Sequence, residues 1–272
     1  MNTRAIRAIV RKDLKVAVQN KGVVLPIIIL PLILFVIFPW VVVYASTMAD
    51  ATVTSFSNVD EILARMPSGL LNELSRYTQD QQLIVFTLVY MLAPMFLIMP
   101  LMVSSVLAAD SFAGEKERKT LEALLYTPTT DRELFIAKLL GAWTAAIAVA
   151  LLSFVVYVVM VNAAGWHSIG YIFFPNWMWV ALVIWVAPAV AGLGLVVMVF
   201  VSVRAQGFQD AYQTGGMVVL PVLLLMVGQI SGVMYFSLGV VLFVGLVIWL
   251  LDLVLLWFAS KSFRRGELMT KF

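Results

Sequence analysis

The sequence contains no cysteine and a single histidine, and charged residues make up only 12% of its 272 positions. The absence of cysteine excludes disulfide bonds and thiolate metal sites. One histidine, His167, is a weak indication of metal binding or catalysis, and we assign it neither. A soluble domain usually carries charge at about a quarter of its positions, whereas 62% of these residues are hydrophobic. The composition therefore predicts an integral membrane protein.

Long apolar runs predict that this membrane protein is all-α and forms a single transmembrane domain over residues 1–272. A helix needs about 20 apolar residues to cross the ~30 Å hydrocarbon core. Six runs are near or above that length, at about 23–45, 82–109, 137–162, 177–203, 214–236 and 238–259. Apolar residues are continuous within each run, which argues against a membrane barrel and its two-residue period. Only Gly and Ser separate the last two runs, so a re-entrant segment followed by one long helix is an alternative there.

The basic residues predict the orientation of these spans. With six spans, 16 of the 18 lysine and arginine residues fall on one side, in residues 1–21, 110–138 and 261–271 and at Arg204. Only Arg65 and Arg76 fall on the other side. The positive-inside rule then places both termini and the loops 110–136 and 202–213 in the cytoplasm. We expect a multi-pass protein of the cell membrane whose basic ends meet the lipid bilayer, and no binding of nucleic acid.

Residues 4–17 have the pattern of an amphipathic helix, within a connecting segment 1–21. One face is basic and the other apolar, with Arg4, Arg7, Arg11 and Lys15 opposite Ile6, Ile9, Val10 and Ala17. We expect this helix to lie along the inner leaflet. Asp13 projects from the middle of the apolar face. It either reaches the lipid headgroups or contacts a partner protein.

A dense run of charge separates the second and third apolar runs. Residues 110–138 carry 11 of the 33 charged side chains. Spacings of four residues between opposite charges, a stripe of leucines and Pro128 predict a short helix over about 114–127. Thr130 and Glu133 fit a capping box, which predicts that the next helix starts there. Such a helix is either a solvated loop helix or a docking element for a soluble partner.

The same run does not form a phosphate-binding loop. Residues 114–120 lack the second glycine of the G-x-x-x-x-G-K-[ST] pattern, whose backbone amides cradle phosphate. The chain is therefore not expected to be an enzyme, and any ATP that drives it is hydrolysed on another chain.

Several segments together resemble the permease subunit of type-2 ATP-binding-cassette (ABC) exporters. They are Arg-Lys-Asp-Leu-Lys at 11–15, the segment from Phe112 to Pro128, Ser202 to Gln206, and Phe263 to Leu268. The resemblance covers essentially the whole chain. It implies that two permease subunits pair, as a homodimer or a heterodimer, and that each engages a separate ATPase subunit.

The resemblance also implies roles for particular residues. ATP and Mg would bind to the partner subunit, with no cofactor on this chain. The helix between spans 2 and 3 would be the coupling helix, which contacts the ATPase together with the N-terminal connecting helix. The implied contact residues are Glu115, Lys116, Glu117, Arg118, Lys119, Thr120 and Glu122, with Arg11 and Asp13 from the connecting helix.

Asp252 is the only acidic residue well inside a predicted span. Burying it in ionised form costs roughly 2.5–3.5 kcal/mol. It either pairs with a Lys, Arg or hydroxyl near the inner end of the last span, which we favour, or it contacts a cation or a substrate. The second interpretation would make the protein a secondary, ion-coupled transporter, the alternative function.

The longest external segment, 46–81, carries two short helical patterns. Val59, Ile62, Leu63 and Met66 form the first, and Leu70, Leu71, Leu74 and Tyr77 form the second. We expect two short helices on the outer surface, as a plain interfacial hairpin or as a gate over an exit.

Overall fold

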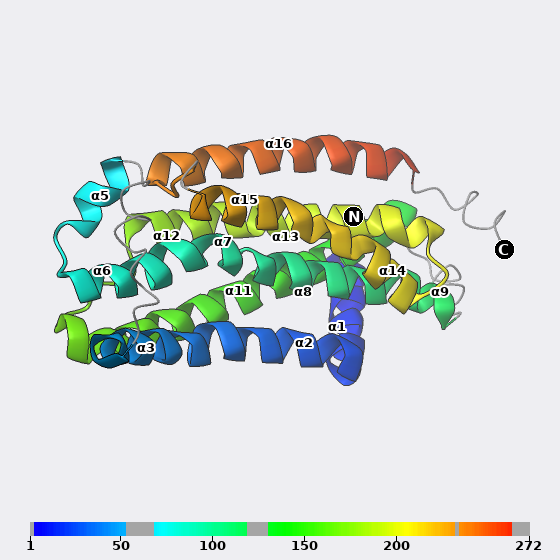
Figure 1. The fold of residues 1–272 in the computed structure, drawn as a ribbon. Helices are drawn as coiled ribbons and strands as arrows, with labels where there is room; N and C mark the ends of the chain where they lie inside the picture. The colour runs from blue at the N-terminus through cyan, green and yellow to red at the C-terminus, as the bar shows by residue number, and fades with distance from the viewer. Residues whose placement is uncertain (1–2, 53–67, 119–129, 232–233, 263–272) are drawn as a thin grey trace.

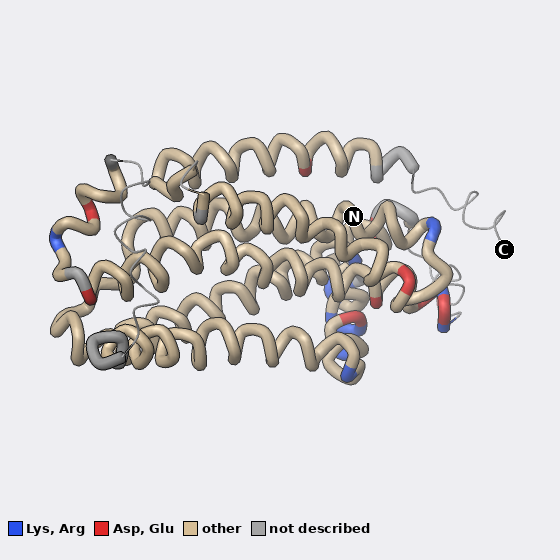
Figure 2. Tube along the Cα trace, in the orientation of Figure 1, with Lys and Arg blue, Asp and Glu red and all other residues tan. Residues whose placement is uncertain are grey.

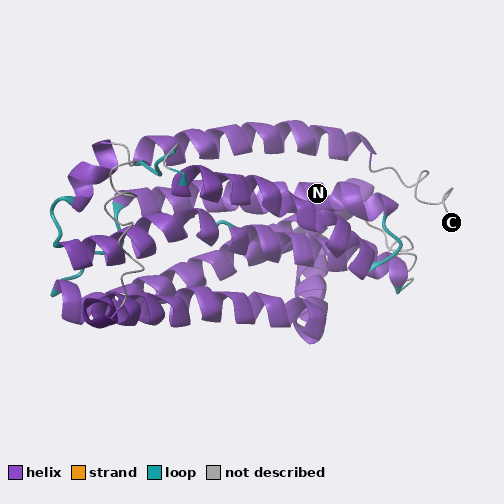
Figure 3. Cartoon of the chain, in the orientation of Figure 1, coloured by secondary structure: helices purple, strands orange, loops and turns teal. Residues whose placement is uncertain are grey.

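The computed structural model describes residues 3–52, 68–118, 130–231 and 234–262 (Figure 1). All regular structure in these residues is helical (Figure 3). The first predicted external helix, around Val59, lies outside the described residues, and so do residues 119–127 of the predicted coupling helix.

Six segments of the described chain are long and apolar enough to cross a membrane, which confirms the predicted number of spans. They run over Lys21–Thr47, Asp80–Glu117, Glu133–Ile169, Trp177–Arg204, Phe208–Gln229 and Leu238–Phe258. We number them span 1 to span 6. Figure 1 shows them side by side, with helix α1 (Thr3–Gln19) running across one end. We call this the α1 end, and the opposite end, where α5 (Ser68–Leu74) lies, the α5 end.

Several spans are built from consecutive helical segments. Span 1 comprises α2 (Lys21–Pro31), the π-helical turn η1 (Leu32–Ile37) and α3 (Phe38–Thr52). Span 2 comprises α6 (Gln79–Val85), the π turn η3 (Phe86–Met91), α7 (Leu92–Phe96), α8 (Ile98–Ala109), the π turn η4 (Asp110–Gly114) and α9 (Glu115–Glu117). Span 3 is the single helix α11 (Asp131–Ile169).

The last three spans follow the same plan. Span 4 comprises α12 (Trp177–Ala181), the π turn η5 (Leu182–Val186) and α13 (Ala187–Arg204). Span 5 comprises α14 (Phe208–Gly215), the 3₁₀ turn η6 (Gly216–Val219) and α15 (Leu220–Ile230), and span 6 is α16 (Leu238–Ser262). The helix break predicted within 228–239 is present, because α15 ends at Ile230 and α16 begins at Leu238.

Two predicted boundaries have different outcomes. The capping box at the start of span 3 is confirmed: Thr130 Oγ1 accepts a hydrogen bond from Glu133 N, and Glu133 Oε2 accepts one from Thr130 N. The helix of span 2 does not stop at residue 109, the predicted end of the span, but continues through η4 and α9 to Glu117. Asp110, Ser111 and Glu115 extend the helix because other elements bury them and satisfy their polar atoms.

Spans 2 and 4 form the centre of the molecule. Their apolar windows are 72% and 67% buried, against 17–28% for the other four spans. Helices α8 and α13 approach closely at Gly194, where an added Cβ would lie 2.7 Å from Ser105 Oγ and 2.8 Å from Ser104 Oγ. Small residues allow such close approach between membrane helices.

Side chains from three later spans form hydrogen bonds to the π turn η3. A π turn interrupts the regular α-helical hydrogen bonds, so its carbonyls need other donors inside a membrane. Tyr157 of α11 donates to Leu88 O at 2.5 Å, Trp179 of α12 donates to Val89 O at 2.7 Å, and Gln229 of α15 donates to Tyr90 O at 2.7 Å. Spans 3, 4 and 5 therefore each hold span 2 by one side chain.

Helix α1 packs on α11 rather than standing alone. Ile9 is buried against Leu134 and Ala137, while Arg4, Arg7 and Arg11 are exposed. The predicted basic and apolar faces are thus present, although the apolar face covers protein. That α1 lies along the inner leaflet stays a prediction.

Candidate functional site

Charged residues gather at the α1 end of the bundle (Figure 2). A few more lie at the α5 end, and the tubes between the two ends are almost free of charge. Lys12 and Asp13 come from α1, Asp110, Glu115 and Arg118 from the end of span 2, and Lys138 from span 3. We call these six residues the polar junction.

Lys138 lies at the centre of the polar junction and is only 1% exposed. Its Nζ donates to Glu115 Oε2 at 2.5 Å and to the carbonyl oxygen of Ser111 at 2.6 Å. Asp13 Oδ2 lies 3.7 Å from the same nitrogen. A buried ammonium group needs such partners, because an unpaired charge in a low-dielectric interior is very costly.

Lys12 engages the other oxygen of the same carboxylate. Its Nζ donates to Glu115 Oε1 at 2.5 Å and lies 3.2 Å from Asp13 Oδ1. Burial lowers the pKa of Lys12, but Glu115 and Asp13 together outweigh burial and raise its pKa above the ordinary value. Glu115, itself only 4% exposed, therefore joins α1 to span 3 through two lysines.

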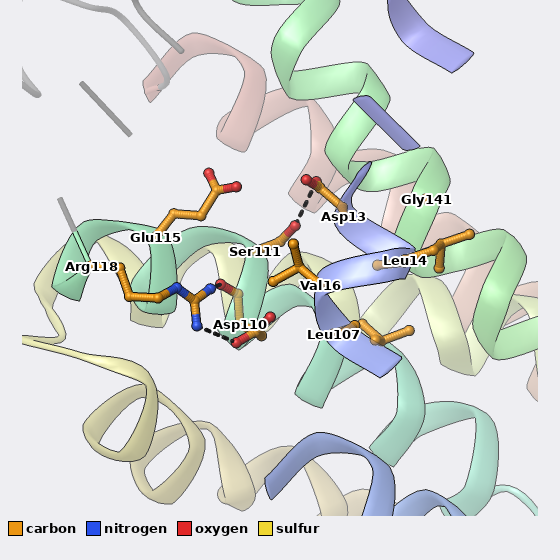
Figure 4. Close-up of a pocket in the computed structure, with 11 residues that line it drawn as sticks. Asp13, Leu14, Val16, Leu107, Asp110, Ser111, Glu115, Arg118 and Gly141 are labelled. Atoms are coloured by element: carbon orange, nitrogen blue, oxygen red, sulfur yellow. Dashed lines mark hydrogen bonds and ion pairs between the residues drawn. The ribbon is translucent and has the colours of Figure 1, made fainter. Parts of the chain in front are cut away.

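Asp13 points into the bundle (Figure 4). Ser111 Oγ donates to Asp13 Oδ2 at 2.9 Å, which links α1 directly to span 2. A small cavity of about 20 Å³ lies beside this pair, between α1, span 2 and span 3. That volume suits about one water molecule and no cofactor.

Asp110 is the second acidic residue that joins separate segments. Asn20, which precedes span 1, donates to its Oδ1 at 3.0 Å, and Arg118 Nη1 donates to the same oxygen at 3.0 Å. Asp110 is 3% exposed, so the charge of Arg118 compensates a buried carboxylate.

The end of span 2 also contacts the connection between spans 4 and 5. Lys116 Nζ donates to the carbonyl oxygen of Ala205 at 3.1 Å, and Phe208 N donates to Glu117 Oε2 at 2.9 Å. Gly207 leaves room for this contact, because an added Cβ would lie 2.5 Å from Glu117 Oε2. The segment 110–118 is thus bonded to α1, span 3 and the start of span 5.

The structure places the predicted ATPase-contact residues in two groups. Glu115 and Asp13 are turned inward and hold the polar junction together. Glu117, Arg118 and Arg11 are exposed. Lys119, Thr120 and Glu122 lie outside the described residues. Contact of any of these with an ATPase stays a prediction.

Sequence reasoning missed the central residue of the junction. From the sequence alone, Lys138 is only one more basic residue near the membrane surface. A signal was present, because Lys138 follows the capping box of Thr130 by two helical turns and stands between apolar neighbours, Ala137 and Leu139. A lysine in that setting needs an acidic partner from another segment.

Asp252 is buried in α16 at 1% exposure, and neither carboxylate oxygen has a hydrogen-bond partner among the described residues. None of the described residues supplies the favoured partner, a basic residue or a hydroxyl, so this pairing stays a prediction. The carboxyl instead packs on Gly192 of α13, where an added Cβ would lie 2.6 Å from Oδ2. This residue was identified from sequence, but its environment was not.

Six candidate membrane spans, two of which form a buried centre, together with a crossing helix tied to one end by ion pairs, define a multi-pass helical membrane protein. No group of three or more potential metal-ligating side chains comes together in the described ranges. A model of the ABC-2 family of transporter proteins matches residues 7–259. The chain belongs to this family and is the membrane component of an ABC transporter, which confirms the resemblance seen in the sequence. No curated protein and no solved structure matches it.

Proposed function

We propose that this chain is the permease subunit of an ATP-driven exporter, and that a separate ATPase subunit docks at the α1 end. In such systems the ATPase is generally a separate subunit. Two permease subunits would pair to enclose the path, and each would engage one ATPase. The basic bias of the α1 end would place this end, and both termini, in the cytoplasm.

The polar junction is the observation that carries this proposal. Docking at one end of a permease drives transport only if the docked segment moves the helices of the path. Here the segment 110–118 is the continuation of span 2, one of the two central spans, and it bonds to α1, span 3 and the start of span 5. A force on this segment would therefore reach the middle of the bundle.

Buried charge makes the junction a stiff connection. Separating Lys138 from Glu115 would leave a buried charge without its partner, at a cost of about 3–5 kcal/mol. Movement of α1 and span 2 as one body is cheaper than separating them. The ATPase would thus shift the permease between two arrangements, provided that it binds the two with different affinity.

The exposed charged residues of α1 and of the segment 110–118 are the proposed contact surface for the ATPase. Glu117, Arg118 and Arg11 are exposed on it, and the other implied contacts Lys119, Thr120 and Glu122 lie outside the described residues. Glu115 and Asp13 would act indirectly, by holding α1 against spans 2 and 3. Under this proposal, some of the residues implied by the resemblance contact the ATPase, and the others hold the contact surface in place.

The test is co-purification with the ATPase subunit of the same transporter. Glu117→Lys combined with Arg11→Glu should remove most of the bound ATPase while the permease still elutes as a folded species. Asp80→Lys, which reverses an exposed charge at the α5 end, is the matched control and should retain the ATPase. Undiminished ATPase binding by the double variant would contradict the docking surface.

A second candidate function rests on Asp252. Its carboxyl is buried without a hydrogen-bond partner in the described residues, as a site for a coupling cation could be. The protein would then be an ion-coupled transporter. The single intramembrane carboxyl and the elaborated α1 end favour the ATP-driven function.

A further inference from the structure

A cavity of about 410 Å³ lies at the α5 end of the bundle, far from the polar junction. That volume is within the usual range of small-molecule sites. The cavity is bounded by α5 and the turn after it, by η3, by residues 173–178 and by the segment that leads into α16. Its aromatic lining residues are Tyr77, Tyr90, Phe173, Trp177, Tyr235 and Phe236.

Glu73 presents one free carboxylate oxygen in this cavity. Tyr90 and Tyr235 both donate their hydroxyl protons to Glu73 Oε2, the second at 3.2 Å. Oε1 accepts no hydrogen bond from the described residues. The two tyrosine rings lie 5.5 Å apart. The carboxylate is thus fixed in orientation and retains an oxygen for a ligand.

The tyrosine hydroxyls act as donors at neutral pH. Burial is the main reason that the pKa of Tyr235 is raised to about 12, and the charge of Glu73 adds to the effect. Tyr235 therefore remains protonated and donates its proton to Glu73 Oε2.

A second charge lines the same cavity. Arg76 lies in the turn that follows α5, three residues after Glu73, and no ion pair joins the two in the described chain. A guanidinium group is well suited to a phosphate, which it binds with two parallel hydrogen bonds. The cavity thus offers one acidic and one basic group, each without an ionic partner among the described residues.

The aromatic residues around the cavity place it at the depth of lipid headgroups. The cavity lies where spans 4 and 6 begin and close to the start of span 2. Trp177 is 79% exposed and Tyr171 is 53% exposed. Exposed tryptophan and tyrosine at the ends of membrane helices are typical of the interface with headgroups.

These features together define the chemistry of a ligand. Aromatic faces beside a carboxylate favour an organic ammonium group, and Arg76 favours an adjacent phosphate. We propose that this cavity binds the zwitterionic headgroup of an amphiphile, with its ammonium group at Glu73 and its phosphate at Arg76. Such a headgroup could belong to a phospholipid of the surrounding bilayer or to an amphiphile that is transported. The proposal does not depend on ATP-driven export.

The test compares two short-chain lipids that differ in the ammonium group. Dihexanoylphosphatidylcholine and dihexanoylphosphatidylglycerol, each below its micelle concentration, are titrated into the full-length protein in maltoside detergent by calorimetry. The wild-type protein should bind the choline lipid about tenfold more tightly. Glu73→Gln should abolish this preference, and Arg76→Gln should weaken binding of both lipids. Asp80→Asn, which removes a carboxylate outside the cavity, should change neither.

Equal affinity of the wild-type protein for both lipids would overturn the proposal, whatever the variants do. Retention of the preference in Glu73→Gln would also overturn it.

Native mass spectrometry after release from mixed phosphatidylcholine and phosphatidylglycerol nanodiscs separates the two possible sources of the headgroup. If the wild type retains choline lipid and Glu73→Gln loses it, the ligand is a lipid of the bilayer. If the wild type retains no lipid but still shows the tenfold preference in calorimetry, the ligand is the headgroup of a transported amphiphile. No ATPase is present, so failure here leaves the proposed docking intact.

Discussion

The ammonium group of Lys138 lies 2.5 Å from Glu115 Oε2, so a lysine that is 1% exposed ties span 3 to the end of span 2. Glu115 also binds Lys12 of α1 at 2.5 Å. One carboxylate thus joins three segments, and its removal affects more than one contact.

We predict that Glu115→Gln destabilises the protein more than Lys138→Met. Loss of Glu115 leaves the buried Lys138 without its main partner, which costs about 3 kcal/mol. Loss of Lys138 leaves Glu115 paired with Lys12, which is partly exposed to water. Thermal unfolding in detergent, with Lys15→Met as an exposed control on α1, measures the difference. A double variant Glu115→Gln with Lys138→Met should regain part of the lost stability, and a fully additive loss would contradict the pairing.

Gly192 is predicted to be intolerant of alanine because of Asp252. The added Cβ would lie 2.6 Å from Asp252 Oδ2, so α13 and α16 would have to move apart. Overpacking of this kind costs about 1–3 kcal/mol. The matched control is Gly239→Ala, where no atom lies within 4 Å of the added Cβ. Asp252→Ala should relieve the strain, so a double variant no more stable than Gly192→Ala alone would count against this contact.

Asp252→Asn is predicted to preserve ATP-driven transport. Asparagine keeps the shape of the side chain and removes the cost of a charge in the membrane. Transport by the purified permease with its ATPase in proteoliposomes should stay within about twofold of wild type, and thermal stability should be equal or higher. Loss of transport with ATP hydrolysis retained would favour the ion-coupled alternative.

The side chains that fasten η3 are predicted to stabilise the fold individually. Tyr157→Phe removes only the hydroxyl that donates to Leu88 O, and Gln229→Leu removes the donor to Tyr90 O. A buried carbonyl left without a donor costs about 1–3 kcal/mol. Each variant should unfold at a lower temperature than Tyr44→Phe, whose ring is 65% exposed. A Tyr157→Phe protein as stable as the Tyr44→Phe control would show that the carbonyl needs no donor.

The spans and their connections could be predicted from the sequence because they depend on local properties. Apolar length defines each span, and the capping box at Thr130 requires residues only three positions apart. The end of span 2 could not be predicted in this way. Acidic residues such as Asp110 and Glu115 normally indicate that a span has ended and the chain has reached water. They can lie within a longer helix only if partners from other segments bury them.

Those partners lie far away in the chain. Lys12 and Glu115 are 103 positions apart, and Asn20 and Asp110 are 90 apart. A single sequence contains no pattern that pairs residues over such separations. For the same reason the contact of Asp252 with Gly192 and the two tyrosines on Glu73 could not be anticipated, although Asp252 itself stood out as an isolated acid.

The hydrogen bonds to η3 have a consequence for biosynthesis. Span 2 leaves the ribosome before its three donors, since Tyr157, Trp179 and Gln229 belong to spans 3, 4 and 5. During that interval the carbonyls of Leu88, Val89 and Tyr90 would lack these side-chain donors, and a bilayer penalises each unsatisfied polar group by several kcal/mol. The nascent second span must therefore begin as a regular α-helix, or remain within the insertion machinery, and acquire its widened turn only as the later helices arrive.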